Sequence, residues 1–180
     1  AYDNSFNGGD SWGFINGYIP YPNGIDLVVT KFSSSGNSLL SSTFVGGSKN
    51  DGINESGAAQ YKNSVLWNFF ADEYRGEIIL DDLDNCYIAS TTKSLDFPMV
   101  NAAQNTNAGL QDAVLFSLNA NLSSLLWSTY YGGSQNDAAY SIQLNSNNQI
   151  YATGGTMSNN LNTSSNAVNP EVSWPSSEIG

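Results

Sequence analysis

Apolar residues in this chain come in short runs that alternate with polar, turn-prone stretches. Four such runs cover residues 113–118, 125–131, 139–144 and 150–154. They are rich in β-branched and aromatic residues, whereas no segment keeps an apolar period of 3.6 residues. The stretches between them, such as 145–148, are mostly Asn and Ser, which suit tight hairpin turns. The pattern therefore predicts short antiparallel strands and no long helix.

The same pattern occurs twice along the chain. Residues 24–51 align with residues 110–137 without a gap at an offset of 86, and 12 of the 28 positions are identical. Beyond this stretch, residues 74–93 match residues 138–157 at an offset of 64. The difference of 22 residues (86 − 64) corresponds to an insertion at 52–73 in the first copy. The basic unit is therefore about 64 residues long.

A unit of four short strands with Gly-rich corners predicts an all-β fold, a β-propeller built from blades of four antiparallel strands. If the run at 139–144 is the innermost strand, one blade frame extends from about residue 74 to residue 131, with half-blades on either side. The expected parts are the tail of a preceding repeat with a linker (1–23), a first unit with its insertion (24–109), a second unit (110–170) and the start of a further segment (171–180).

The number of units limits what this chain can form by itself. Closed propellers contain about four to eight blades. A chain with fewer than three units is not expected to close a ring alone, and an open stack leaves strand edges exposed. We therefore expect an excerpt of a longer chain, or a chain that blades from other chains complete. Other blades are the first partners that this predicts.

The amino-acid composition excludes several classes of partner and of catalytic site. Only 12% of the residues are charged, with 16 Asp and Glu against 5 Lys and Arg and a formal net charge of −11. This balance argues against nucleic acid and anionic membranes as partners, because both attract basic patches. No apolar run is long enough for membrane insertion. Without His there is no Ser-His-Asp or Cys-His catalysis, and a single Cys forms no internal disulfide. No enzymatic activity and no cofactor are expected from this stretch.

Gly and Asp residues recur at the same place in both units. Each unit has a Gly pair followed by an Asp, namely Gly46, Gly47 and Asp51 in the first and Gly132, Gly133 and Asp137 in the second. Recurrence favours structural corners in which the carboxylate accepts backbone N–H bonds. The alternative is that paired carboxylates carry acid–base chemistry. The glycines are not a phosphate loop, because no Lys-Ser or Lys-Thr follows them.

Two other segments are candidate sites. An oxygen-rich turn with Asp81, Asp82 and Asp84 could hold Ca²⁺, but the EF-hand pattern is absent and the matching turn at 145–148 is neutral. A solvated hairpin tip is the favoured interpretation. The insertion carries aromatic residues that could contact a glycan or protein partner, or pack on a neighbouring blade. They are Tyr61, Trp67, Phe69 and Phe70.

Two single residues carry expectations about the core. Trp127 lies within a predicted strand that recurs in both units, so we expect it to be a core residue. Cys86 stands where the other unit has Ile150, an apolar strand position. A buried free thiol is therefore expected at Cys86.

The order of these motifs resembles a known family. The segments Leu126-Trp127-Ser128-Thr129-Tyr130 and Gly132-Gly133-Ser134 are similar to the most specific element of the bacterial SBBP repeat, the so-called seven-bladed β-propeller repeat. Asp96-Phe97-Pro98 is another match, and the N-terminal AYDNSFNGG looks like the linker between repeats. The second unit departs from the pattern, with Asn160-Leu161-Asn162 in place of Asp-Phe-Pro. The resemblance covers residues 24–51 and 74–170.

The resemblance implies a β-propeller within a large secreted or surface-exposed protein, often from Bacteroidota and similar bacteria. The expected function is a non-enzymatic binding or spacer scaffold for adhesion, gliding motility on surfaces or glycan contact. One alternative is a secreted glycan-active enzyme with an Asp/Glu pair at the mouth of the propeller, although the Asp-box turn of sialidase-like propellers is absent. Another is a partner subunit or cargo of an outer-membrane export or gliding machinery.

Overall fold

The computed structural model describes residues 1–11, 19, 21–54 and 76–168. Within these residues the chain forms β-strands and no helix. The strands are β1 (Leu27–Phe32), β2 (Leu39–Val45), β3 (Glu77–Leu80), β4 (Cys86–Thr92), β5 (Asp112–Leu118), β6 (Leu125–Tyr131), β7 (Asp137–Leu144) and β8 (Ile150–Thr156). The expectation of an all-β chain with antiparallel sheets is therefore confirmed.

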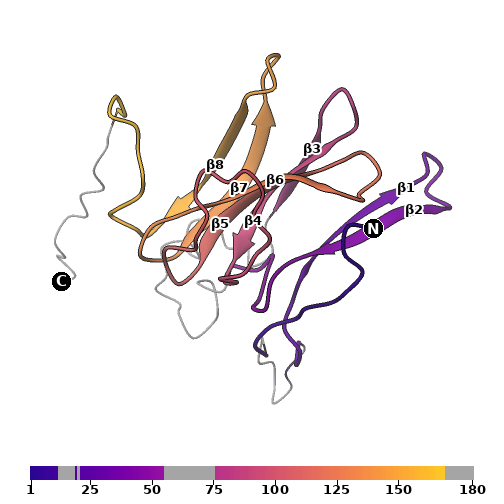
Figure 1. Ribbon diagram of the computed structural model, residues 1–180, viewed down its shortest axis with the longest axis horizontal. Helices are drawn as coiled ribbons and strands as arrows, with labels where there is room; N and C mark the ends of the chain where they lie inside the picture. Colours follow the sequence, from indigo (N-terminus) through magenta and orange to yellow (C-terminus); the bar gives the residue numbers. More distant parts are fainter. Residues whose placement is uncertain (12–18, 20, 55–75, 169–180) are drawn as a thin grey trace, which may run out of the picture.

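Consecutive strands form three antiparallel sheets (Figure 1). β1 pairs with β2, strands β3 to β6 form one sheet in that order, and β7 pairs with β8. We refer to β1–β2 as the N-terminal pair, to β3–β6 as the middle sheet and to β7–β8 as the C-terminal pair. The middle sheet extends from Glu77 to Tyr131.

Strand limits follow the apolar runs of the sequence closely. β6 has the predicted limits, whereas β5 begins one residue earlier, at Asp112. β7 begins two residues earlier, at Asp137, and β8 ends two residues later, at Thr156. The outermost residue of each extension is polar, namely Asp112, Asp137 and Thr156. Asp112 and Asp137 can enter strands because their side chains accept hydrogen bonds where the sheets end.

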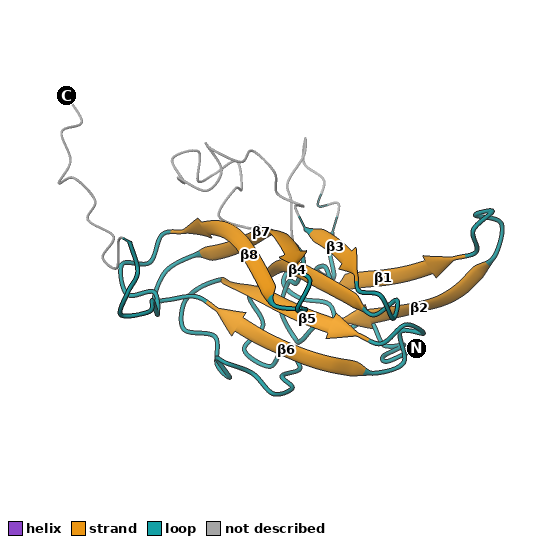
Figure 2. Ribbon diagram, turned by 90° about the horizontal axis from the view of Figure 1, so that it is seen from above, coloured by secondary structure: helices purple, strands orange, loops and turns teal. Residues whose placement is uncertain are grey.

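Each face of the middle sheet packs on a different strand pair. On one face, Val114 of β5 is buried in a cluster with Val29 and Val45 of the N-terminal pair. On the other face, Ala113 packs with Ile142 of β7. This alternation follows from the two-residue period of a strand. Figure 2 shows β7 and β8 lying along β4 and β5. Fully burying a side chain such as Val or Ile stabilises the fold by about 1.5–3 kcal/mol.

The insertion interrupts the first strand of the middle sheet. Asp51 forms an isolated bridge with Thr92, and β3 then begins at Glu77, opposite Ala89. In the second unit the equivalent residues belong to the single strand β7, which has an irregularity between Ala139 and Ser141. The insertion therefore enters the repeat where β7 already departs from regular pairing. Residues 55–75, which include most of it, lie outside the described part of the chain.

Two expectations about the core have different outcomes. Cys86 is buried and forms no disulfide, as expected. Trp127 is only half-buried, so its assignment to the core is wrong. It pairs with Ser117 and shares the face of the middle sheet that β7 covers. β7 packs mainly on β3, β4 and β5, and much less on β6. Strand position alone did not reveal this difference.

Candidate functional site

The recurring Gly and Asp residues form two corners between successive sheets. The first corner lies where the chain leaves β2 and joins Gly47 and Asp51 to the end of β4, at Thr92 and Ser94. The second corner lies where the chain leaves β6 and joins Gly133 and Asp137 to Ser158, just after β8. Each corner thus ties a crossing loop to the strand end of the sheet that follows.

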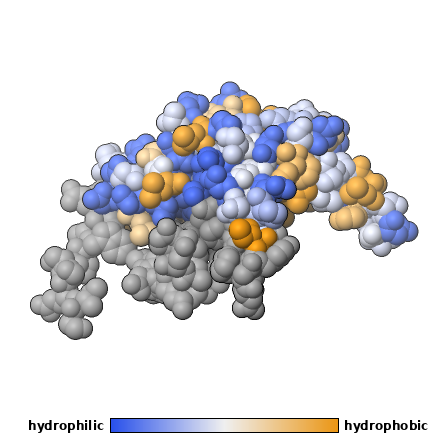
Figure 3. Space-filling view, turned by 90° about the horizontal axis from the view of Figure 1, so that it is seen from below, coloured by the Kyte–Doolittle hydropathy of each residue, from blue (hydrophilic) through white to orange (hydrophobic). Residues whose placement is uncertain are grey.

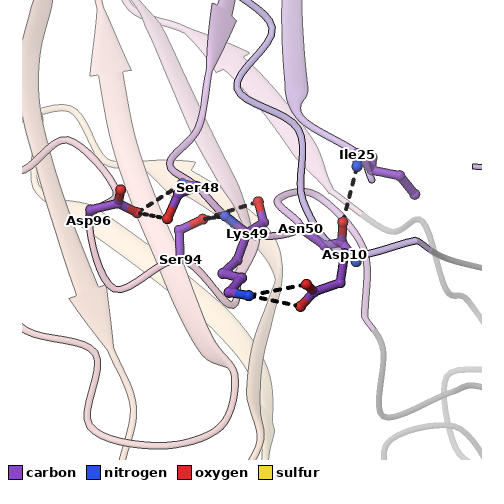
Figure 4. Close-up of polar contacts among 7 residues, drawn as sticks. All are labelled: Asp10, Ile25, Ser48, Lys49, Asn50, Ser94 and Asp96. Carbon is purple, nitrogen blue, oxygen red and sulfur yellow. Dashed lines mark hydrogen bonds and ion pairs between the residues drawn. The ribbon is translucent and has the colours of Figure 1, made fainter. Parts of the chain in front are cut away.

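Asp51 is completely buried at the first corner. Its Oδ2 accepts hydrogen bonds from the Gly47 N–H at 2.7 Å and the Ser94 hydroxyl at 2.9 Å. Its Oδ1 accepts a hydrogen bond from the Thr92 hydroxyl. The Ser94 oxygen in turn accepts the Lys49 N–H at 2.9 Å (Figure 4). The carboxyl group therefore joins backbone on one side to strand-end hydroxyls on the other.

The second corner repeats the hydrogen bonds to Oδ2, whereas Oδ1 of Asp137 has no hydrogen-bond partner among the described residues. Oδ2 of Asp137 accepts the Gly133 N–H at 2.7 Å and the Ser158 hydroxyl at 2.8 Å. The Ser158 oxygen accepts the Gln135 N–H at 2.9 Å. These residues stand 86 or 64 positions after their counterparts, the two offsets of the sequence repeat. The corner is therefore a property of the repeat and not of one position in the chain.

A further hydrogen-bond acceptor lies beside each corner, and it explains why the second unit can have Asn where the Asp-Phe-Pro pattern has Asp. Oδ1 of Asp96 accepts the Ser48 N–H at 2.8 Å and the Ser48 hydroxyl at 3.1 Å (Figure 4). In the second unit, Oδ1 of Asn160 accepts the Ser134 N–H at 2.9 Å and its hydroxyl at 3.0 Å. Only one side-chain oxygen is used in each case. Asn can therefore replace Asp without losing these bonds.

Close approach of the backbone explains the second glycine of each pair. A Cβ atom on Gly47 would lie 2.6 Å from the Ser94 Cβ and 2.4 Å from the Asp96 Oδ1. A Cβ atom on Gly133 would lie 2.6 Å from the Ser158 Cβ. Such distances are far shorter than ordinary contacts, so any larger residue would push the crossing loop away from the next sheet. The glycines serve packing here and do not form a ligand cradle.

A second carboxyl group adjoins each corner, and the sequence analysis did not single it out. Oδ2 of Asp26 accepts the N–H groups of Asn7 at 2.6 Å and Gly8 at 3.1 Å. Oδ2 of Asp112 accepts the Ala108 N–H at 2.9 Å. Both residues hold the linker that precedes their unit. Asp26 and Asp112 are identical in the repeat alignment, and that identity was the signal that could have identified them.

Burial dominates the electrostatics of these carboxyl groups. Desolvation raises the pKa of Asp51 to about 7, although the hydrogen bonds that it accepts act in the opposite direction. The pKa of Asp112 is raised to about 6, mainly by burial, and the nearby Asp137 carboxyl adds to the rise. Burial likewise raises the pKa of Asp26. These acids are therefore protonated at a higher pH than exposed carboxyls.

The proposed Ca²⁺ turn is a hairpin tip whose first carboxylate is already engaged. Oδ1 of Asp81 accepts the N–H groups of Leu83 and Asn85, each at 2.9 Å. The neutral Asn145 of the second unit does the same, with the N–H groups of Asn147 at 3.0 Å and Gln149 at 2.9 Å. The same turn therefore forms with or without a charge, and these bonds close the hairpin.

The other two acidic residues of the tip are exposed: Asp82 faces solvent, and Asp84 lies near a lysine. Asp84 has a positive φ of 61° and lies 4.0 Å from the Lys31 ammonium group. Desolvation by itself would raise the pKa of Asp81, but the hydrogen bonds from Asn85, Leu83 and Tyr87 together lower it. Among the residues that the structure describes, no group of three His, Cys, Asp or Glu side chains is arranged to hold a metal ion. Asp82 therefore belongs to no such group among the described side chains.

The aromatic contact candidates are not placed by the structure. Tyr61, Trp67, Phe69 and Phe70 all belong to residues 55–75, outside the described part of the chain. A different apolar feature was not predicted from the sequence. A hollow of about 130 Å³ lies between the middle sheet and the C-terminal pair. Its lining includes Leu115, Tyr131 and Gly154.

Comparisons with known proteins add no family assignment. No protein-family model matches the chain, and no curated protein is similar enough to match it. The described residues also contain no helix with the length and apolar character needed to cross a membrane. The functional argument therefore depends on the repeat and on the geometry of its corners.

Proposed function

We propose that this chain is a β-propeller segment that acts as a non-enzymatic binding or spacer scaffold in a large secreted or surface-exposed bacterial protein. A whole four-stranded antiparallel sheet between two strand pairs supports this proposal, because four antiparallel strands are the number that a propeller blade contains. The sheets also pack face to face in chain order. Such stacking is the way in which repeat units bury a continuous core.

The geometry of the two corners supports the proposal that the scaffold is not an enzyme. Asp51 and Asp137 are 0% and 2% exposed, and both are engaged with backbone N–H groups and Ser hydroxyls. A general acid or a nucleophile must reach its substrate. These carboxyl groups are enclosed by their own repeat instead. The most prominent chemistry that recurs in the sequence is therefore architectural.

The surface supports a role in contact rather than catalysis. The chain carries a net charge of −11 and few cations, which favours neutral or glycan partners over anionic ones. The proposed settings are adhesion, gliding motility or glycan contact at the bacterial surface. Several large apolar side chains are also exposed on the strands, among them Val28, Phe32 and Leu39. Exposed apolar side chains that gather into a patch are typical of protein contacts.

A combined binding and turnover assay tests the proposal. The full chain is incubated with chromogenic glycosides and with a panel of bacterial polysaccharides, and both product release and retardation in affinity electrophoresis are measured. We expect retardation by at least one polysaccharide and no product. Turnover that disappears in E77Q, the carboxyl of β3, but persists in D10N, an exposed carboxyl, would overturn the scaffold proposal. Circular dichroism confirms that both variants are folded.

A further inference from the structure

Two strand edges are left without partners in the described part of the chain. β1 pairs only with β2, and β8 pairs only with β7. According to the repeat, β1 is the counterpart of β5 (offset 86), and β8 is the counterpart of β4 (offset 64). In the middle sheet β4 and β5 pair with each other, from Cys86 opposite Leu118 to Thr92 opposite Asp112. The two pairs are thus the two halves of a sheet that the chain also contains whole.

We propose that β8 of one copy pairs with β1 of a second copy and completes a four-stranded sheet across the two chains. This inference rests on the proposed function, in which the sheets of successive repeat units stack face to face. Its register follows from the observed pairing of β4 and β5. Shifting each residue by its offset places Ile150 opposite Phe32, Ala152 opposite Thr30, Gly154 opposite Val28 and Thr156 opposite Asp26. The order across the new sheet is β7, β8, β1 and β2.

Exposure along the N-terminal pair supports this second copy. Val28, Phe32 and Leu39 are 58%, 57% and 61% exposed. Their counterparts in the middle sheet, Val114, Leu118 and Leu125, are 0%, 0% and 9% exposed. In the middle sheet this face is covered by the N-terminal pair itself. The same face of the N-terminal pair therefore lacks the layer that the repeat provides elsewhere, and Figure 3 shows apolar surface at that end of the molecule.

The opposite face of the middle sheet offers the matching surface. Tyr131 is 42% exposed and lines the hollow with Leu115. Their counterparts in the N-terminal pair, Val45 and Val29, are 0% and 6% exposed because they pack on the middle sheet. Pairing β8 with β1 of a second copy places its Val28 face over Leu115 and Tyr131. A single docking geometry therefore pairs both free strand edges, and it also covers the exposed apolar face and the hollow.

The contact joins different surfaces of the two copies. Each copy offers a β1 edge at one end and a β8 edge at the other, so the arrangement is head-to-tail and forms a ring or an open chain of copies. Each copy carries a net charge of −11, and the repulsion between copies is screened by salt. Association is therefore expected to strengthen as the salt concentration rises.

A cross-link between two differently substituted chains tests the register. T30C protein and A152C protein are prepared separately, mixed and oxidised. Residues directly opposite each other on neighbouring strands have Cβ atoms about 4.5–5.5 Å apart, close to the spacing that a disulfide accepts. We expect a mixed disulfide dimer. K31C mixed with A152C is the matched control, because adjacent residues point to opposite faces. Equal cross-linking in the control would overturn the register.

Sedimentation velocity of the unsubstituted chain tests association itself. We expect concentration-dependent species at multiples of the chain mass, increasing with salt. V28K should weaken association about tenfold or more, because it places a charge in the new contact. L83K is the control, since Leu83 is also exposed, at 75% against 58% for Val28, but lies on a hairpin tip away from the contact. A monomer at every concentration, with no mixed disulfide, would reject the second copy and leave the glycan assay unaffected.

Discussion

The carboxylate of Glu77 accepts a hydrogen bond from the hydroxyl of Ser141, its own counterpart 64 residues later in the repeat. The same Oε2 accepts the Ile142 N–H at 2.6 Å. Glu77 lies on β3 and Ser141 on β7, so this contact joins the first strands of two successive sheets. The apolar packing beside it consists largely of small residues such as Ala89 and Ala139. A polar bond therefore supplements a thin apolar contact.

E77A should loosen the C-terminal pair. Removing the carboxylate leaves the Ser141 hydroxyl and the Ile142 N–H without their acceptor, and the free energy of unfolding should fall by about 2 kcal/mol. Urea denaturation gives this difference, and hydrogen exchange at the Ile142 amide should accelerate. E77Q keeps one acceptor oxygen and should lose less. An unchanged exchange rate at Ile142 in E77A would show that the contact does not hold β7.

Matched substitutions at the two corners should have similar effects. S94A and S158A each remove a hydroxyl that links an Asp carboxyl to a crossing-loop N–H, and each should lower stability by about 1–2 kcal/mol. S94A should cost slightly more, because the Ser94 oxygen also lies 3.1 Å from the Lys49 carbonyl. S35A, on an exposed hairpin, is the control. A loss confined to one corner would contradict the equivalence of the two.

Tyr130 carries a buried hydroxyl that joins two segments. It accepts the Phe97 N–H at 3.1 Å and donates to the Ser94 carbonyl at 2.8 Å. Burial raises the pKa of Tyr130 to about 12, so the hydroxyl remains a donor at ordinary pH. Y130F should lower stability by about 1–2 kcal/mol in urea denaturation, because both partners stay buried. Y131F removes an exposed bond to Asn162 and should change little; equal losses would contradict this assignment.

The strands were predictable because their signal is local. Alternation and turn residues lie within a few positions of each other, and the limits of β6 follow from them directly. The repeat extended this information to the glycines and to Asp51 and Asp137. Burial of Trp127 was not predictable in this way, because it depends on how far the next sheet reaches across β6.

The partners of the corner carboxyls were harder to predict. Thr92 and Ser94 lie more than 40 residues from Asp51, and they meet it only when the chain crosses to the next sheet. Asp26 and Asp112 hold neighbouring linkers through backbone N–H groups, which carry no signal in the sequence. The interruption of the first strand of the middle sheet by the insertion likewise becomes visible only from the pairing of Asp51 and Glu77 with β4.

Stability should fall as the pH rises from about 4 to about 7. In the unfolded chain Asp51 ionises near its ordinary pKa of 3.8, whereas in the folded chain burial raises its pKa to about 7. Between these values the folded state binds one more proton than the unfolded state, so each rise in pH favours unfolding. The loss is complete above the folded pKa and amounts to about 4 kcal/mol for Asp51. Asp112 contributes in the same direction up to about pH 6.

Urea midpoints measured across this range for the wild-type chain and D51N test the prediction. D51N loses one acceptor oxygen and should be less stable than wild type near pH 4, where Asp51 is protonated in the folded chain and close to its ordinary pKa of 3.8 in the unfolded chain. Because Asn does not ionise, the variant should lose less stability on going to pH 7, and the two curves should converge. Asp112 still titrates in D51N, so a shallower slope should remain. A wild-type midpoint that rises from pH 4 to 7 would contradict the dominance of burial at these corners.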